Sequence, residues 1–242
     1  MTDLVGIAVA PILVLLIYIY IRDKYEKEPK ILCLKCLLIG ALSSLPIVYV
    51  ERLLFELAPI SNNYFYKAFY ISFVVASFTE ETFKYIIFAL LIYYNKKNRG
   101  YFNEPFDGLV YSAFISLGFA LVENILYVLS PTLGGISTGI LRSIFSIPAH
   151  FIFAIYMGYY FSNNKFNKFN KSNNKINNIS LLYAYIVPIL VHGVYDLLLF
   201  SNLYYIQVLF LLYFIYILLS SIRIIKQFIN SSPFKYNNKY ID

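Results

Sequence analysis

The sequence has few charged residues for its length, and this scarcity excludes a soluble globular protein. Only 14% of its 242 residues are Asp, Glu, Lys or Arg, and 60% are hydrophobic, whereas a soluble domain is about one quarter charged. The hydrophobic residues form continuous runs of about 20 residues, long enough to cross a bilayer as helices. The strands of an outer-membrane barrel would alternate polar and apolar residues instead. We therefore expect an all-α, polytopic integral membrane protein.

Tryptophan and cysteine are also scarce. Trp is absent, and the 25 Tyr residues take the interfacial place that Trp often has. The two cysteines, Cys33 and Cys36, form a Cys-x-x-Cys pair, but no further cysteine exists to complete a zinc site. A redox or metal role stays open for this pair. The favoured interpretation is that both are small apolar residues at the start of a membrane span.

The N-terminal apolar run lacks the preceding basic residues and the small-residue cleavage site of a secretory signal peptide. We therefore expect residues 4–21 to be retained as the first of about seven transmembrane helices. The other predicted spans are residues 31–50, 66–94, 106–129, 136–161, 180–200 and 203–225. They assign residues 1–229 to one transmembrane domain with a polar internal cavity and residues 230–242 to a polar cytosolic tail.

Lysine and arginine are concentrated in every second loop of the predicted bundle, on one side of the membrane. The loops after the first, third and fifth spans and the C-terminal tail are rich in them, whereas the alternate loops hold only Arg52 and Lys67. By the positive-inside rule, the N-terminus lies outside and the C-terminus in the cytosol of a multi-pass plasma-membrane protein. The net charge of +7 is then explained by topology, and no nucleic-acid partner is expected.

Charged residues interrupt the third run, in Glu80-Glu81-x-x-Lys84. Charge at membrane depth is costly and marks functional positions that face a protein interior. Lys84 is one helical turn from both carboxylates and can neutralise one of them, so the other needs a further partner.

The only two histidines fall near the centres of the fifth and sixth spans. At about 1.5 Å per residue, His150 and His192 lie within about one turn of the depth of Glu80 and Glu81. Asp196 shares a helix face with His192. Polar bonds between membrane helices contribute only about 0.6 to 2 kcal/mol each. This many polar groups at one depth therefore indicate a functional site rather than helix adhesion.

Four motifs follow one another along the chain. They are Glu80-Glu81-x-x-Lys84, then Phe106-Asp107-Gly108-Leu109-Val110-Tyr111 running on to Gly118-Phe119-Ala120-x-x-Glu123-Asn124, then Pro148-Ala149-His150, then His192-Gly193-x-Tyr195-Asp196. Together with the charged loop at 23–29, they resemble the PrsW family of intramembrane proteases, from about residue 18 to residue 200. That family is similar to the CAAX-type (CPBP) prenyl endopeptidases and to a seven-span subunit of γ-secretase.

The resemblance implies a helical membrane fold with a conical cavity, and hydrolysis of peptide bonds. The family's known member cleaves a membrane-anchored anti-sigma factor on its extracytoplasmic side. The expected partner is therefore a single-span membrane protein or a membrane-associated peptide, held in the lipid bilayer.

Amide hydrolysis needs an activated water, a group that stabilises the oxyanion and an acid for the leaving amine. No Ser or Cys is paired with the histidines in a recognisable motif, which disfavours a covalent route. We expect Glu80 to act as general base on a water held jointly with His150, while Glu81 pairs with Lys84. Which glutamate is the base stays open, because neighbours on a helix point about 100° apart.

The resemblance to CAAX-type enzymes implies that His192 stabilises the oxyanion with the polar residue one turn later. That residue is commonly Asn in those enzymes and is Asp196 here. An ionised carboxylate only accepts hydrogen bonds, so Asp196 is expected instead to orient His192 and keep it protonated.

A metal-dependent mechanism of peptide hydrolysis could use the same residues. Glu80, His150 and His192 would form a three-ligand zinc site with water in the fourth position. These ligands come from three helices and lack an HExxH pair, so the metal-independent version, with no cofactor, is preferred.

Further polar residues accompany the central group. Glu123, Asn124 and Arg142 lie toward the outer side, where they either bind the substrate backbone or pair Glu123 with Arg142; the pairing is slightly favoured. Asp107 is expected to cap the N-terminus of its helix rather than to take part in catalysis.

Two other functions remain as alternatives. A non-enzymatic membrane scaffold, like the γ-secretase subunit, would keep the polar contacts and cleave nothing. A proton-coupled transporter would use Glu, Asp and His as a relay, although the chain shows neither an inverted repeat nor paired broken helices. A water-filled cavity on which Glu80, His150 and His192 converge would favour the protease.

Overall fold

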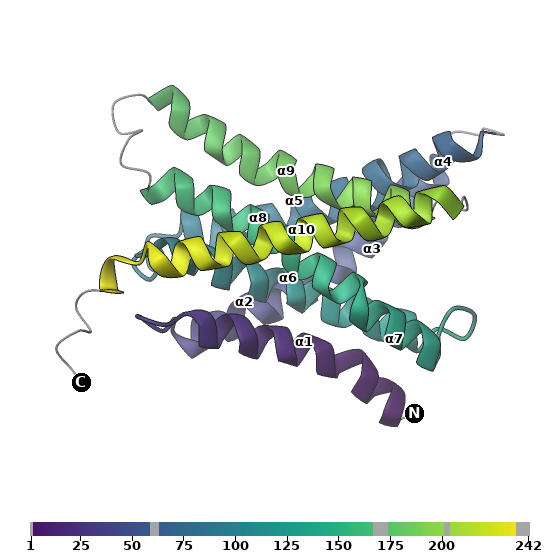
Figure 1. Cartoon of the computed structure of the whole chain (residues 1–242), viewed down its shortest axis with the longest axis horizontal. Helices are drawn as coiled ribbons and strands as arrows, with labels where there is room; N and C mark the ends of the chain where they lie inside the picture. Colours follow the sequence, from purple (N-terminus) through teal and green to yellow (C-terminus); the bar gives the residue numbers. More distant parts are fainter. Residues whose placement is uncertain (1, 59–62, 167–173, 201–203, 236–242) are drawn as a thin grey trace.

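In the computed structural model, the chain forms a bundle of helices that run roughly along one long axis (Figure 1). The structure describes residues 2–58, 63–166, 174–200 and 204–235, and these ranges contain no strand. The helices in chain order are α1 (Thr2–Arg22), α2 (Lys30–Leu42), α3 (Ser44–Glu56), α4 (Tyr64–Tyr70), the π-helix η1 (Ile71–Phe78), α5 (Thr79–Phe88), the π-helix η2 (Ala89–Tyr93), α6 (Pro105–Val128), α7 (Ile136–Ile144), α8 (Ser146–Phe166), α9 (Asn174–Phe200) and α10 (Tyr204–Asn230).

Six helical segments of the described ranges are long and apolar enough to cross a membrane. They are Asp3–Arg22, Lys30–Glu56, Pro105–Val128, Ile136–Phe166, Ile179–Phe200 and Val208–Asn230. The predicted third span is a further segment, helical from Tyr64 to Tyr93 but divided into α4, η1, α5 and η2. The start of α1 and the end of α10 lie at opposite ends of the bundle (Figure 1). The chain is an all-α, multi-pass membrane protein.

Two predicted spans are interrupted, and a proline explains each break. The segment 30–56 divides at Ser43, because Pro46 cannot accommodate the carbonyl of Leu42, four residues earlier, in a continuous helix. The segment 136–166 divides at Phe145, because Pro148 cannot accommodate the carbonyl of Ile144, the last residue of α7, in a continuous helix. Both segments also run beyond the predicted ends at Val50 and Phe161.

The connection between the predicted spans 136–161 and 180–200 is shorter than those spans imply. Helix α8 continues to Phe166 and α9 already begins at Asn174, and the residues between them lie outside the described ranges. At the C-terminus, α10 ends at Asn230, where the polar tail was predicted to start. The end of that tail, residues 236–242, also lies outside the described ranges.

Helix α6 lies in the middle of the bundle (Figure 1) and most of its side chains are buried. Glycine allows α2 to approach it closely: a Cβ atom at Gly40 would collide with the backbone carbonyl of Ile115, and one at Gly118 with that of Leu37. Small residues are typical of tightly packed membrane helices.

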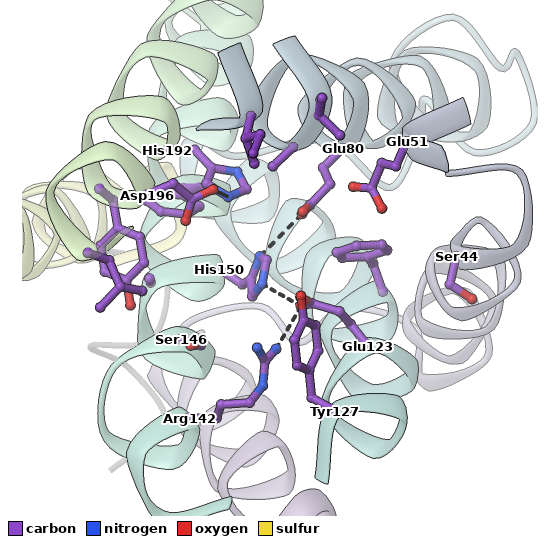
Figure 2. A pocket seen from close by; sticks show the side chains of 18 of the residues that line it. Ser44, Glu51, Glu80, Glu123, Tyr127, Arg142, Ser146, His150, His192 and Asp196 are labelled. Carbon is purple, nitrogen blue, oxygen red and sulfur yellow. Dashed lines mark hydrogen bonds and ion pairs between the residues drawn. The ribbon is translucent and has the colours of Figure 1, made fainter. Parts of the chain in front are cut away.

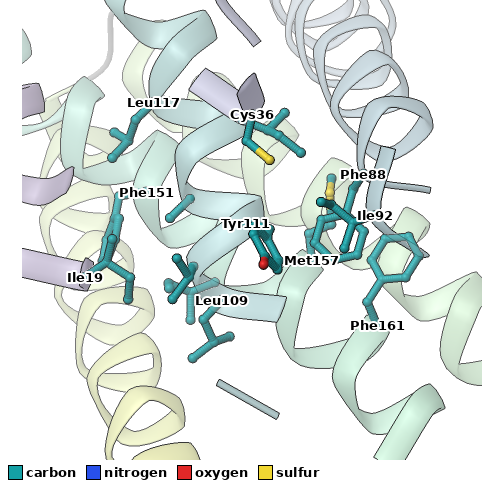
Figure 3. Close-up of a cluster of buried hydrophobic side chains, with 14 of the residues drawn as sticks. Ile19, Cys36, Phe88, Ile92, Leu109, Tyr111, Leu117, Phe151, Met157 and Phe161 are labelled. Atoms are coloured by element: carbon teal, nitrogen blue, oxygen red, sulfur yellow. The ribbon is translucent and has the colours of Figure 1, made fainter. Parts of the chain in front are cut away.

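The apolar core surrounds α6. Side chains from several helices, among them Ile19, Leu109, Phe151 and Cys36, form one buried cluster (Figure 3). Cys33 and Cys36 are buried, free thiols within this cluster. That placement fits their interpretation as small apolar residues. The core holds α5, α6, α8 and α9 in fixed positions, and these helices carry the polar side chains described next.

Candidate active site

Lys84 lies between the two carboxylates of its own helix. Its Nζ atom is 3.0 Å from Oε2 of Glu80 and 2.7 Å from Oε1 of Glu81, and all three side chains are buried. The sequence predicted that Lys84 neutralises one glutamate; the structure shows that it contacts both. Helix α5 follows directly on the π-helix η1, and π-helical turns often occur at functional sites.

His150, on α8, connects this group to α6 and α7. Its Nε2 atom is 2.9 Å from Oε2 of Glu123, and Nη2 of Arg142 is also 2.9 Å from that oxygen. The favoured pairing of Glu123 with Arg142 is therefore present, and Arg142 Nε also donates to Asn124 Oδ1 at 2.8 Å. The contact between Glu123 and His150 was not foreseen.

The other ring nitrogen of His150 faces α5. Nδ1 lies 3.4 Å from Nζ of Lys84 and 3.8 Å from Oε2 of Glu80. The second distance is too long for a direct hydrogen bond, but two polar atoms so placed can share a water. Figure 2 shows Glu80, His150, Glu123 and Arg142 as a continuous chain of contacts.

His192, on α9, is held between two carboxylates. Its Nδ1 atom is 3.1 Å from Oε1 of Glu81, and its Nε2 atom is 3.2 Å from Oδ2 of Asp196, one turn further along the helix. The ring also stacks on Phe153, with the two centroids 4.5 Å apart. Both nitrogens are thus already in contact with acceptors, which the expected oxyanion role did not anticipate.

These side chains surround one cavity of about 400 Å³. Glu80, Glu123, His150, His192 and Asp196 line it, whereas Glu81 and Lys84 lie outside its lining (Figure 2). The two adjacent glutamates therefore have different environments: Glu80 can meet a molecule in the cavity, and Glu81 is fully buried behind it.

The structure brings together the residues predicted from sequence and adds one that sequence reasoning missed. Glu51 of α3 lines the same cavity, and its side chain lies across from Glu80 (Figure 2). It was overlooked because the second span was predicted to end at Val50. Its spacing from Ser44 and Val48, which also line the cavity, matches one helix face and was the available signal.

Asp107 lies apart from this cavity, at the start of α6. Its Oδ2 atom accepts the backbone N–H groups of Asn103 and Glu104, both at 2.7 Å. This geometry is that of a helix cap, as the sequence predicted.

A metal ion would find suitable ligands beside the cavity. Glu80, Glu81 and His192 each offer one ligand atom, and these atoms lie within 4.8 Å of one another. Carboxylate oxygens with an imidazole nitrogen form a donor set that suits zinc. Oε2 of Glu81 is buried without a hydrogen-bond partner in the described part of the chain, so a donor is available. This set contains Glu81 in place of His150, which the sequence-based set included.

Comparison with known proteins gives the same function. Residues 28–221 match the family described as PrsW family intramembrane metalloprotease, which covers most of the chain. The chain belongs to the PrsW family. It is therefore an intramembrane protease, and the family description favours the metal-dependent version of the chemistry over the metal-independent one preferred from sequence.

Curated relatives agree with this family assignment. The chain is 36% identical to "Protease PrsW" of Clostridioides difficile (strain 630) over 231 residues, which cover 95% of this chain and 93% of the relative. It is 34% identical to "Protease PrsW" of Geobacillus kaustophilus (strain HTA426), covering 84% and 82% of the two chains. The corresponding protein of Bacillus subtilis (strain 168) is 31% identical, with 82% and 84% covered. No solved structure gives a significant match.

Proposed function

We propose that this PrsW-family protease hydrolyses a peptide bond of a single-span membrane protein or membrane-associated peptide, such as an anti-sigma factor, in the cavity beside Glu80. The observation that carries the proposal is the position of Glu80 Oε2, 3.8 Å from His150 Nδ1. Both groups line the cavity, so a substrate carbonyl in that space would meet a water held between them.

Glu80 is the general base in this mechanism. It takes a proton from the water as the water oxygen bonds to the scissile carbonyl carbon. The proton then passes to the amide nitrogen as the carbon–nitrogen bond breaks. The choice of Glu80 over Glu81 rests on access, because only Glu80 lines the cavity.

His150 positions the water and is itself positioned by Glu123. With Nε2 donating to Glu123, Nδ1 is an acceptor that faces Lys84 Nζ at 3.4 Å and Glu80 Oε2 at 3.8 Å, so a water between Nδ1 and Glu80 would donate to it. The ion pair from Arg142 to Glu123 holds that carboxylate in place.

His192 stabilises the oxyanion in this proposal. Of its two carboxylate contacts, the one to Asp196 faces the cavity, whereas the one to Glu81 is buried behind it. A substrate oxygen can therefore replace Asp196 at Nε2 and receive its N–H. Asp196 keeps the ring oriented and charged until the substrate arrives.

The residues fit the metal that the family description implies. Glu80, Glu81 and His192 would hold it, with the His192 imidazole neutral and its Nδ1 lone pair on the ion instead of a proton shared with Glu81. Zinc there would supply Lewis acidity toward the carbonyl and the water. Lys84 places a positive charge between the same two carboxylates. Each carboxylate has two oxygens, so Glu80 retains one oxygen that can take up a proton.

The proposed orientation places the cavity toward the outer side of the membrane. The lining includes Ser44 and Glu51 of α3 and Arg142 of α7, which belong to the end of the bundle that holds the N-terminus (Figure 1). The basic loops lie at the other end, which the positive-inside rule places in the cytosol. Cleavage is thus expected on the extracytoplasmic side.

Cleavage of a panel of single-span substrates by the purified full-length protein in detergent tests these roles. We expect Glu80→Gln to lower kcat about 10²- to 10⁴-fold, the usual contribution of a general base, and His150→Ala and His192→Ala to lower it strongly as well. Glu56→Gln is the matched control, because Glu56 is 60% exposed and lies outside the cavity. Cleavage that survives Glu80→Gln, Glu81→Gln, His150→Ala and His192→Ala would reject the assignment.

A chelation experiment distinguishes the metal-dependent mechanism from the metal-independent one. We expect 1,10-phenanthroline to abolish cleavage, added zinc to restore it, and the non-chelating 1,7 isomer to have no effect. Full activity of protein shown to be metal-free would reject the metal and leave Glu80 and His150 as the water-activating pair. A scaffold would cleave none of the substrates with or without zinc.

A further inference from the structure

A second group of buried acids lies away from the active site, where α1 ends and α6 begins. This acidic cluster consists of Asp23, Glu28, Glu104 and Asp107, and each of the four residues is at most 4% exposed. One carboxylate oxygen from each of Asp23, Glu104 and Asp107 lies within 4.8 Å of the others. The proposed proteolysis does not use any of these residues.

Three carboxylates of the cluster keep an oxygen without a partner. Asp23 Oδ2 accepts the backbone N–H of Glu28 at 3.2 Å, and Asp107 Oδ2 accepts two backbone N–H groups at 2.7 Å. The remaining oxygens, Asp23 Oδ1, Asp107 Oδ1 and Glu104 Oε2, are buried and form no hydrogen bond within the described ranges. The backbone thus fixes two carboxylates and leaves acceptors that a cation could use.

Glu28, the remaining acid of the cluster, lies close to Asp107. The carboxyl groups of Glu28 and Asp107 are within hydrogen-bonding reach of each other, and the Tyr111 hydroxyl donates to Glu28 Oε2. Two ionised carboxylates cannot hydrogen-bond each other, because both are acceptors. Either a proton or a cation must lie between such groups.

Neighbouring lysines do not neutralise the cluster. Lys27 Nζ donates to the backbone carbonyls of Tyr20, Ile21 and Asp23, and Lys165 Nζ donates to those of Arg99 and Phe102. Within the described ranges, no Lys or Arg forms an ion pair with a carboxylate of the cluster. Buried charge without a counter-ion is strongly unfavourable.

We propose that the acidic cluster binds a divalent cation that prefers oxygen ligands, Mg²⁺ or Ca²⁺, which fastens the loop after α1 to the first turn of α6. Carboxylate oxygens are the ligands that both ions favour. The all-oxygen donor set distinguishes this site from Glu80, Glu81 and His192, whose imidazole suits zinc. Without a cation, burial raises the pKa of Asp23 to about 7 and that of Glu28 to about 8, so proton sharing is the competing arrangement.

Thermal unfolding of the full-length protein in detergent, freed of metal beforehand, tests the proposal. A thiol-reactive dye reports unfolding, because Cys33 and Cys36 are buried and free. We expect Mg²⁺ or Ca²⁺ at about 100 times its Kd to raise Tm by about 5 °C or more. Equilibrium dialysis should show one bound ion per chain.

Variants assign any stabilisation to the cluster. Asp23→Asn and Glu104→Gln preserve size but remove charge, so they should abolish binding and the Tm shift, and should not lower the Tm of the metal-free protein. Two controls should retain both: Glu56→Gln, at an exposed carboxylate, and Glu81→Gln, which removes a ligand from the zinc-type set.

Three outcomes would overturn the proposal. The first is that neither cation binds to wild-type protein in dialysis, which shows that the acids share protons. The second is that Asp23→Asn and Glu104→Gln bind the cation as well as wild type. The third is that Glu81→Gln alone abolishes binding, which places the ion beside the active-site cavity. Because dialysis uses wild-type protein, a variant that fails to fold leaves the first outcome decisive.

Discussion

Oε2 of Glu123 lies 2.9 Å from Nε2 of His150, on the side of the imidazole ring opposite Glu80. Because a carboxylate only accepts hydrogen bonds, Nε2 donates in this contact, and in the proposed mechanism Nδ1 is left to face the water that Glu80 would activate. Arg142 holds Glu123 from the other side, also at 2.9 Å. We therefore propose that Glu123 acts through His150 rather than on the substrate, as a positioning residue.

Replacing Glu123 with Gln tests this positioning role. The amide keeps the size of the side chain but loses the charge that orients the imidazole and pairs with Arg142. We expect kcat to fall about 10- to 100-fold, the loss typical of removing a carboxylate that orients a metal-bound histidine, with little change in KM. Steady-state cleavage of a fluorogenic peptide gives both constants. If only the folded fraction falls, with kcat per folded molecule unchanged, Glu123 is merely structural.

Replacing Lys84 with Met tests the charge balance of the site. The change leaves Glu80 and Glu81 as neighbouring buried carboxylates without their shared cation. We expect a loss of stability of about 3–5 kcal/mol, the usual cost of breaking a buried ion pair. Unfolding in a detergent titration measures it. The double variant Lys84→Met with Glu81→Gln removes one charge of each sign and should recover part of the loss; equal stability of Lys84→Met and wild type would contradict the prediction.

Two glycines make a matched pair for the packing of α2 on α6. Gly40→Ala places a Cβ against the carbonyl of Ile115, whereas Gly6→Ala meets nothing within 4 Å. We expect Gly40→Ala to destabilise the protein by about 1–3 kcal/mol through overpacking and Gly6→Ala to leave it unchanged or slightly more stable. Thermal unfolding with the thiol-reactive dye compares them. Equal stability of the two variants would mean that α2 and α6 are not held this close.

The predicted topology is tested with reporter fusions. A C-terminal green fluorescent protein should be fluorescent in cells and a C-terminal alkaline phosphatase inactive, because the positive-inside rule places this end in the cytosol. A phosphatase inserted in the loop between α6 and α7 should be active, since that loop lies on the opposite side. The reverse pattern would reject the orientation and would move the cavity to the cytosolic half.

The spans and the depth of their charges follow from local properties of the sequence. The two prolines that divide the segments 30–56 and 136–166 were visible, but the apolar runs around them are continuous, so composition predicted unbroken helices. The π-helix η1, at Ile71–Phe78, has no comparable signal: it contains neither Gly nor Pro, and packing against neighbouring helices decides the local turn. Glu51 was missed for a related reason, because helix length depends on tertiary contacts as well as hydropathy.

By itself the sequence determined that this is a helical membrane protein, and that Glu80, Glu81, His150 and His192 share one depth. Burying apolar runs in lipid and excluding charge from it depend on residue type and spacing alone. Only the tertiary structure decided which partner each polar group has. Neighbouring residues on a helix point about 100° apart, and packing around α6 sets how each helix is rotated. That rotation puts Glu80 on the cavity and Glu81 behind it, and brings Glu123 to His150. It also leaves the acidic cluster without an ion pair to any lysine or arginine that the structure describes.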